Sequence, residues 1–231
     1  MGTDDIFKNQ REERKKRKIG TKIPKPNSFL IVTEGEKTEP LYLNGLKKYI
    51  TNKYGGFIDI EEVFPLIDIS GEGKCTVSLL EAAKRLVNKS KIIYQNVWLA
   101  FDKDDFEDFD EAIVLAKEEG YEVAWSNQSF EYWLYIHFHF SDAALHRDDW
   151  FSKLSDVFKD YNINKEGYEK NLVNVFELVT ANGGLKTAIG NASRLLSRYD
   201  NKNISPSQID PSTTMHKLVL SFEDYISELL E

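Results

Sequence analysis

Residues 29–36 read FLIVTEGE and residues 97–105 read VWLAFDKDD, and these two stretches decide the fold. Each is a short run of apolar residues that stops at carboxylates. Apolar runs of this length, without polar alternation, are typical of central strands that are buried on both faces of a parallel sheet. In open α/β sheets, ligands bind at the carboxyl ends of the strands. We therefore expect Glu34, Asp102 and Asp104 to come together at one end of the sheet.

The residue types at these strand ends favour a hard metal ion. Asp102 and Asp104 lie two positions apart, so an extended segment places both side chains on the same side, where they can share one ion. Mg²⁺ binds through a few carboxylates together with water and substrate phosphate, and Mn²⁺ is the alternative ion. Glu34 is expected to ligate a second ion or to handle a proton, because clustered acids raise one another's pKa. The three acids predict a metal-dependent enzyme that acts on a phosphodiester.

Other polar residues near the strand ends are weaker candidates. Lysines beside the acids can stabilise the charge of a phosphate in a transition state. The further candidate ligands are Glu36, Asp105 and Glu131, and the candidate phosphate contacts are Lys37, Lys74 and Lys103. An ordinary surface position is the alternative for the lysines, and a buried acid bonded to local backbone N–H groups is the alternative for Glu131. His216 is a candidate catalytic residue whose alternative is to brace the fold.

Apolar segments and turn residues predict a β-α-β-α-β core. Strands are expected near residues 29–33, 57–60, 63–67, 97–101 and 121–126, and helices near 39–50, 77–90 and 108–119. Pro65 indicates an edge position for its strand. Thr76 is predicted to cap the second helix, while Asn127 and Ser129 are predicted to cap an aromatic-rich helix over 130–140. Further helices are expected over 148–158, 169–180, 185–199 and 213–230, with no further strand.

These segments predict three parts: a basic flexible arm over residues 1–26, an α/β core over 27–140, and a helical extension over 141–231 packed on that core. The arm contains nine Lys and Arg against four Asp and Glu, a net charge of +5. Since the whole chain carries −8, the remainder carries −13. Such an arm can dock on nucleic-acid phosphates, and a solvated tail is the alternative.

Composition excludes several classes of protein. The chain has 231 residues and one cysteine, Cys75, so an internal disulfide and a zinc site of several thiolates are both excluded. No apolar stretch approaches the roughly 20 residues that span a bilayer, and the N-terminus has no apolar signal core. We therefore expect a cytoplasmic protein that does not contact membranes.

Glu34-Gly35 at one strand end and the Asp-x-Asp of residues 102–104 at a later one resemble the Toprim domain of topoisomerases, primases and related nucleases. The resemblance covers about residues 28–127. It implies a compact, Rossmannoid parallel α/β sheet and a Mg²⁺ ion held by Glu34, Asp102 and Asp104.

A narrower resemblance extends over residues 28–220. Residues 31–40 (IVTEGEKTEP), 101–106 (FDKDDF), 126–134 (SNQSFEYWL) with 137–138 (HF), and 210–219 (DPSTTMHKLV) are similar, in this order, to four motifs of the RloB-like proteins. Gln128 stands where proline is commoner in that family, and Asp210 where asparagine is commoner. Neither departure changes the three acids.

The RloB-like resemblance implies a bacterial antiphage defence or abortive-infection factor. It further implies Mg²⁺-dependent nuclease activity on RNA, with tRNA as one candidate, or on DNA, and an ABC-type ATPase partner. A homo-oligomer is also compatible with it. The alternative is a non-catalytic subunit that binds nucleic acid or the partner and keeps the core as a scaffold.

Overall fold

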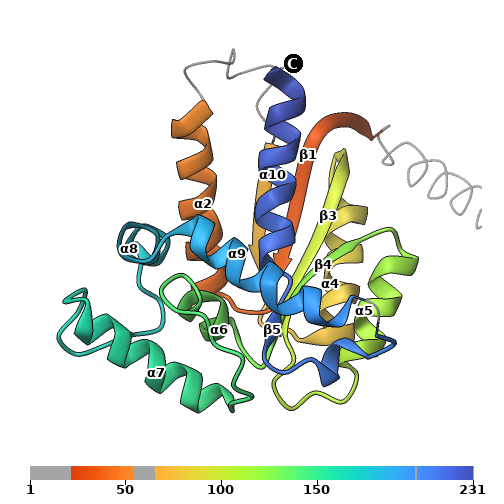
Figure 1. Cartoon of the computed structure of the whole chain (residues 1–231). Helices are drawn as coiled ribbons and strands as arrows, with labels where there is room; N and C mark the ends of the chain where they lie inside the picture. The colour runs from red at the N-terminus through yellow and green to blue at the C-terminus, as the bar shows by residue number, and fades with distance from the viewer. Residues whose placement is uncertain (1–21, 55–65, 201, 231) are drawn as a thin grey trace, which may run out of the picture.

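The computed structural model describes residues 22–54, 66–200 and 202–230. Helices surround a central sheet (Figure 1). In chain order the elements are β1 (Ile23–Thr33), α2 (Thr38–Tyr54), β2 (Leu66–Gly71), α4 (Thr76–Lys89), β3 (Ile92–Asp102), α5 (Phe109–Glu118), β4 (Glu122–Asn127), α6 (Phe130–Tyr135), α7 (Arg147–Asp160), α8 (Val175–Asn182), α9 (Leu185–Leu196), the 3₁₀ turns η1 (Ser197–Tyr199) and η2 (Pro206–Gln208), β5 (Ser212–Thr213) and α10 (Met215–Leu230).

The sheet has the strand order β2-β1-β3-β4-β5, and the first four strands are parallel. The chain goes from β1 to β2 on one side and then returns past β1 to β3 on the other. This reversal makes the gap between the ends of β1 and β3 a topological switch point, where α/β sheets of this kind bind ligands. The predicted Rossmannoid α/β fold is confirmed. Figure 1 shows the carboxyl ends of the strands at its lower side, facing α6 and α7.

Alternating side chains of the central strands fill two separate cores. Phe29 and Ile31 face the core built with α2, α6, α7, α8, α9 and α10. Leu30 and Val32 face the opposite core, built with α4 and α5. The prediction that residues 29–33 form a strand buried on both faces is therefore confirmed, and the unbroken apolar run is explained by helices on both sides.

β1 begins at Ile23, before the predicted boundary at residue 26, and Ile23 pairs with Ile92. Its pairing with β3 shifts in register between Lys25 and Phe29. The Ser28 hydroxyl fills this irregularity by donating to the Lys25 carbonyl and accepting from the Gln95 N–H. Residues 1–21 lie outside the described part of the chain.

β2 lies at the edge of the sheet, as Pro65 indicated, and runs from Leu66 to Gly71. The strand predicted over 57–60 lies outside the described residues. The chain was predicted to have no strand after residue 126, and this was wrong. β5 pairs antiparallel with β4, and the two buried hydroxyls of Ser126 and Thr213 lie 3.1 Å apart across this pairing.

Helix boundaries differ from the predictions where local turns intervene. The helix predicted over 169–180 begins only at Val175. Asn171 has φ of +71°, which an α-helix does not accommodate, and residues 172–174 are also non-helical. The aromatic helix ends at Tyr135, where bonds of the 3₁₀ type such as Phe138 N–H to Tyr135 O close the last turn. Thr76 is not a cap. Cys75 occupies the N-cap position of α4, and the Thr76 hydroxyl donates to the Asp108 carboxylate at 2.8 Å.

Among the described residues, no helix has both the length and the apolar character needed to cross a bilayer.

Candidate active site

The ends of β1 and β3 are tied together by their own acidic residues. The Glu34 N–H donates to the Ala100 carbonyl at 2.8 Å, which extends the parallel pairing by one residue. The Glu34 carboxylate in turn accepts from the Asp102 N–H, with 3.2 Å between Oε2 and N. The strand register therefore places Glu34 and Asp102 side by side, as the sequence predicted.

Three glycines let the loops after β1 and β2 approach closely. The Gly73 N–H donates to the Glu34 carbonyl at 3.0 Å, so the two loops share a hydrogen bond. A Cβ on Gly71 would lie 2.7 Å from the Gly35 carbonyl oxygen, and a Cβ on Gly35 would lie 1.9 Å from a carboxylate oxygen of Glu39. Gly73 also has φ of +60°, a backbone conformation that favours glycine. The glycines bring the backbone of both loops to the acids.

Two cavities meet at the acids. The larger, of about 430 Å³, lies over the ends of β1 and β3, and the smaller, of about 200 Å³, extends beneath α7. Asp102, Asp104 and Lys170 line both of them. The larger is also lined by Glu34, Gly35, Glu36, Lys37, Thr38, Glu39, Gly73 and Asn171, and the smaller by Ser129, Glu131, Arg147, Asp148 and Phe151. The two cavities therefore form one acidic site on either side of Asp102 and Asp104.

Asp102 lies at the centre of this site and also holds α6. Its Oδ2 accepts from the Phe130 N–H at 2.8 Å and so takes the capping role predicted for Ser129. Ser129 occupies the N-cap position, but its hydroxyl makes no such bond. Burial raises the pKa of Asp102 well above its usual range, and the neighbouring charges of Glu39 and Glu34 raise it further.

Glu34 and Glu39 also have raised pKa values, because both are buried and lie near other acids. Burial raises the pKa of Glu34 to about 7, partly offset by the hydrogen bond from the Asp102 N–H and reinforced by Asp104. Burial also raises the pKa of Glu39, partly offset by backbone hydrogen bonds, and the nearby Glu131 raises it further. At neutral pH, protons therefore remain on part of the acidic set.

Asp104 is held in an unusual backbone conformation, with φ of +41°. Its N–H donates to the Gln128 carbonyl at 3.1 Å, which ties the loop after β3 to the loop after β4. Its carboxylate forms an ion pair with Arg147 at 3.0 Å. Burial raises the pKa of Asp104, and Arg147 opposes that rise.

The donor chemistry of the site suits a divalent cation. The acids supply oxygen ligands, as Mg²⁺ and Mn²⁺ prefer, and their mutual repulsion is the condition that a bound cation relieves. Within residues 22–54, 66–200 and 202–230, however, no three His, Cys, Asp or Glu side chains already form a group that could hold a metal ion. A cation would therefore bind only after side-chain rearrangement. Arg147, which pairs with Asp104, and Lys170, which pairs with Glu131, are the neighbouring positive charges.

The other predicted residues divide between the site and its surroundings. Glu36 and Lys37 are exposed and line the larger cavity, and Glu131 is buried in the wall of the smaller one. Asp105 lines neither cavity, but its largely exposed carboxylate lies 3.6 Å from Arg147.

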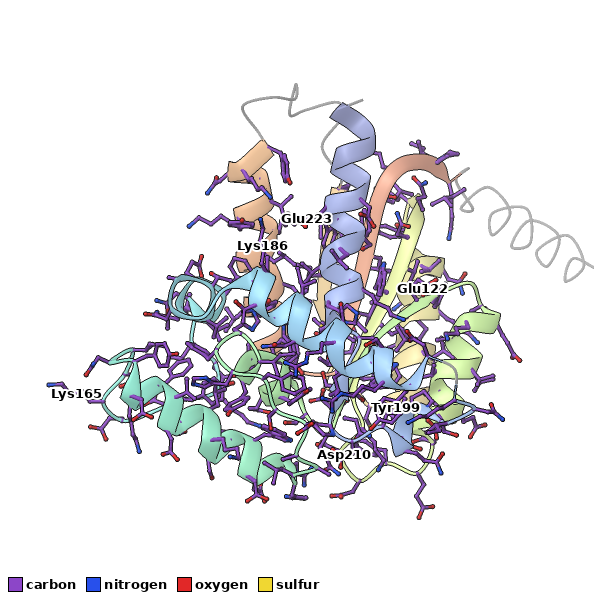
Figure 2. All side chains as sticks on the ribbon, viewed as in Figure 1. Glu122, Lys165, Lys186, Tyr199, Asp210 and Glu223 are labelled. Atoms are coloured by element: carbon purple, nitrogen blue, oxygen red, sulfur yellow. The ribbon has the colours of Figure 1, made fainter. Side chains whose placement is uncertain are left out.

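Lys74, Lys103 and His216 do not line either cavity. Lys74 pairs with Glu72 at 3.6 Å. Lys103 donates to the Asp104 carbonyl at 3.2 Å and also favours the charged form of Asp210, whose pKa burial raises overall. Asp210 lies at the same lower side of the molecule as the strand ends (Figure 2). His216 is buried in the first turn of α10, where burial lowers its pKa to about 4. This placement favours its structural alternative.

Three residues of the site were not singled out from the sequence. Glu39 lies in the first turn of α2, inside the first motif, and only its burial distinguishes it from a helix-start acid. Arg147 could have been noticed in the sequence, because a positive charge in the first turn of a predicted helix is unfavourable with the helix dipole. Lys170 lies in an irregular segment whose sequence carries no such signal, and its ammonium lies 3.5 Å from Glu131.

A comparison with protein families matches residues 29–221 to the family described as RloB-like protein. A comparison with curated proteins found no significant match, and neither did one with solved structures. The match covers most of the chain. It includes the strand ends that carry the acids, and it also includes Arg147 and Lys170. The chain therefore belongs to the RloB-like protein family.

Proposed function

We propose that this RloB-like protein is a divalent-cation-dependent nuclease that hydrolyses phosphodiesters of RNA or DNA. The observation that carries the proposal is the meeting of Glu34, Glu39, Asp102, Asp104 and Glu131 around one pair of cavities at the switch point of the sheet. Acids that repel one another destabilise the folded protein. A cluster of such acids in a cavity is typical of a site where a cation assists the chemistry.

Asp102 and Asp104 would hold Mg²⁺ or Mn²⁺, with Glu34 as a further ligand or as the proton-transfer group. The cation would neutralise phosphate charge and make a bound water more acidic. Asp102 is held by its hydrogen bond from the Phe130 N–H of α6 and by the pairing of β3 with β4. Lys37 lines the larger cavity and Lys170 lines both, and on this proposal they would contact phosphate oxygens.

Glu34 suits proton transfer because burial holds its pKa at about 7. A general base works best when its pKa lies near the working pH. Asp102 N–H engages Oε2 of the Glu34 carboxylate, which orients the group at the cavity wall. This pKa belongs to the cation-free protein. If Glu34 is not itself a ligand of the cation, it would remove a proton from the attacking water.

Family membership supports a role in antiphage defence, with an ABC-type ATPase as the partner and tRNA among the candidate substrates. The charge distribution supports contact with nucleic acid through a limited surface. Outside residues 1–26 the chain carries −13, which disfavours broad binding along a groove, whereas the basic segment over 1–26 can contact phosphates.

Cleavage of total tRNA, single-stranded DNA and duplex DNA with Mg²⁺ or Mn²⁺ tests this function. The wild type should cleave at least one of them, and Glu34→Gln and Asp104→Asn should each lose about 100-fold or more in rate. The matched controls are Glu81→Gln on the exposed face of α4 and Asp142→Asn, an exposed acid paired with Arg198. Equal cleavage by the site variants and the wild type would overturn the proposal.

A second candidate is a binding subunit that does not cleave. The observation in its favour is that Asp104 already pairs with Arg147 and that no ready metal-binding group exists among the described residues. On this account the ATPase partner copurifies with the protein, and no nucleic acid is cleaved even when both are present. Cleavage that appears only on adding the ATPase would instead support a partner-dependent nuclease.

A further inference from the structure

Arg147 is placed to occupy the acidic site rather than to support its own helix. It is the first residue of α7, and a cation there is opposed by the positive end of the helix dipole. Asp148 and Asp149, in the same first turn, are the residues that favour the helix. The guanidinium instead reaches across to the loop after β3, with 3.0 Å from Nη1 to Asp104 and 3.6 Å from Nη2 to Asp105.

The acid that Arg147 engages is one of the two that line both cavities. Asp104 is 22% exposed, whereas Arg147 is 42% exposed. The carboxylate is therefore fixed in the site, while the guanidinium lies at its rim with solvent on one side. A long side chain in that position can leave the carboxylate by rotating about its own bonds, without moving α7.

A divalent cation and a guanidinium compete for the Asp104 carboxylate. Their positive charges repel at this range, and the Oδ2 that accepts from Arg147 is less available as a ligand while the ion pair is intact. A displaced Arg147 would remain at the wall of the smaller cavity, beside Phe151 and within the same site. A guanidinium presents a planar set of donors that matches phosphate oxygens.

We propose that Arg147 is a gate of the acidic site. In the cation-free protein it neutralises Asp104 and competes with divalent cations for that carboxylate. When a cation takes Asp104, the guanidinium transfers to a phosphate of the bound strand and positions it. The competition requires only that Asp104 binds a cation, while the phosphate contact rests on the proposed nuclease function.

Titration calorimetry with Mn²⁺ on the full-length chain tests the competition. Arg147→Ala should bind Mn²⁺ about two- to five-fold more tightly than the wild type, as expected for removal of one partly exposed ion pair. Arg147→Lys should lie between the two, since an ammonium cannot bridge both carboxylates. Arg198→Ala is the matched control. Arg198 is 43% exposed, pairs with Asp142 at 2.7 Å and lines neither cavity.

Loss of Arg147 should weaken nucleic-acid binding, although it strengthens Mn²⁺ binding. Arg147→Ala should raise KM for the cleaved nucleic acid about tenfold, through loss of a charge-assisted contact, while the Arg198 variant leaves it unchanged. A purely structural role for Arg147 would weaken Mn²⁺ binding and cleavage together. Tighter Mn²⁺ binding together with poorer cleavage by Arg147→Ala therefore distinguishes the gate from a purely structural role.

Unchanged or weaker Mn²⁺ binding by Arg147→Ala, with a wild type that binds Mn²⁺, overturns the gate and leaves the proposed nuclease intact. Tighter binding by the variant supports the gate even if the wild type cleaves none of the nucleic acids, a result that counts against the nuclease alone. Absence of Mn²⁺ binding in the wild type and in every variant contradicts both.

Discussion

Glu34 has a carboxyl group that is largely buried among other acids. Its carboxyl group is fixed at the end of a buried strand, within a set of acids that repel it. The protein has an ion pair for Asp104 and one for Glu131, while Glu34 receives the Asp102 N–H. The result is a carboxyl group whose pKa stands at about 7, against an ordinary value of 4.5.

This shift links stability to pH. Between pH 4.5 and 7 the folded protein keeps a proton on Glu34 that the unfolded chain has released, so the free energy of unfolding falls as pH rises through this interval. Glu34→Gln should remove this contribution and be more stable than the wild type by about 2–3 kcal/mol at pH 8, with little difference below pH 4.5. Urea unfolding at a series of pH values measures it.

Glu36→Gln is the control for this measurement, because Glu36 lies two residues further along the same loop and is exposed. It should follow the wild-type pH dependence. A Glu34→Gln protein that loses stability between pH 4.5 and 8 as steeply as the wild type would contradict a raised pKa for this carboxyl group.

The sequence was sufficient to predict Glu34 and Asp102 as neighbours because adjacent parallel strands end at the same level of the sheet. The extended geometry predicted for residues 102–104 was wrong, because β3 ends at Asp102 and Asp104 has φ of +41°. Asp104 still lines the same two cavities as Asp102. The sequence was insufficient for Arg147 and Lys170. Their approach depends on how α7 and the segment before α8 pack beneath the strand ends, and no local periodicity encodes that packing. Ser129 was predicted to cap α6, but Asp102 does so instead. Local sequence could not predict this bond either, since the Phe130 donor and the Asp102 acceptor lie 28 residues apart.

At the scale of elements, the site depends on loops that approach one another more closely than side chains allow. The loops after β1 and β2 are joined by hydrogen bonds from Glu72 N–H to Thr33 O and from Gly73 N–H to Glu34 O. The glycines at 35, 71 and 73 make this possible. Alternating strands and helices were predictable from apolar periodicity. The strand β5 was not, because it is two polar residues long, with the Thr213 hydroxyl donating to Trp125 O beside the backbone pairing.

Gly71→Ala tests the close approach. Its new Cβ would lie 2.7 Å from the Gly35 carbonyl oxygen and 2.8 Å from the Glu36 Cα, both backbone atoms that cannot rotate away. We expect a loss of about 1–3 kcal/mol in unfolding free energy, measured by urea denaturation. Gly190→Ala in the exposed part of α9 meets nothing within 4 Å and should stabilise by about 0.5–1 kcal/mol. Equal effects of the two substitutions would argue against crowding at the loops.

At the scale of the whole molecule, the C-terminal part completes both the core and the site. Trp150, Phe158 and Phe222 belong to the same core as Phe29 and Ile31 of β1. Arg147 and Lys170 also come from this part of the chain. Residues 141–231 were predicted as a helical extension packed on the α/β core, and helices of that part lie in one hydrophobic cluster with the sheet. Which side chains meet across residue 140 depends on long-range packing that local composition does not specify.

A chain that ends at residue 140 should therefore not fold. It would expose the face of the sheet and of α2 that α7, α8, α9 and α10 cover, and an apolar surface of that kind favours aggregation. Circular dichroism and thermal melting of the truncated and full-length proteins measure this. A soluble truncated chain with a cooperative melting transition close to that of the full-length protein would contradict a shared core.

On the function proposed above, the acids at the ends of β1 and β3 bind a divalent cation. A crystal of the wild-type protein soaked in Mn²⁺ at pH 8, with the ion located by anomalous scattering, is the decisive experiment. We expect an anomalous peak about 2 Å from carboxylate oxygens of Asp102 and Asp104, with Arg147 detached from Asp104. An intact Arg147–Asp104 ion pair and no anomalous peak in either cavity would contradict it.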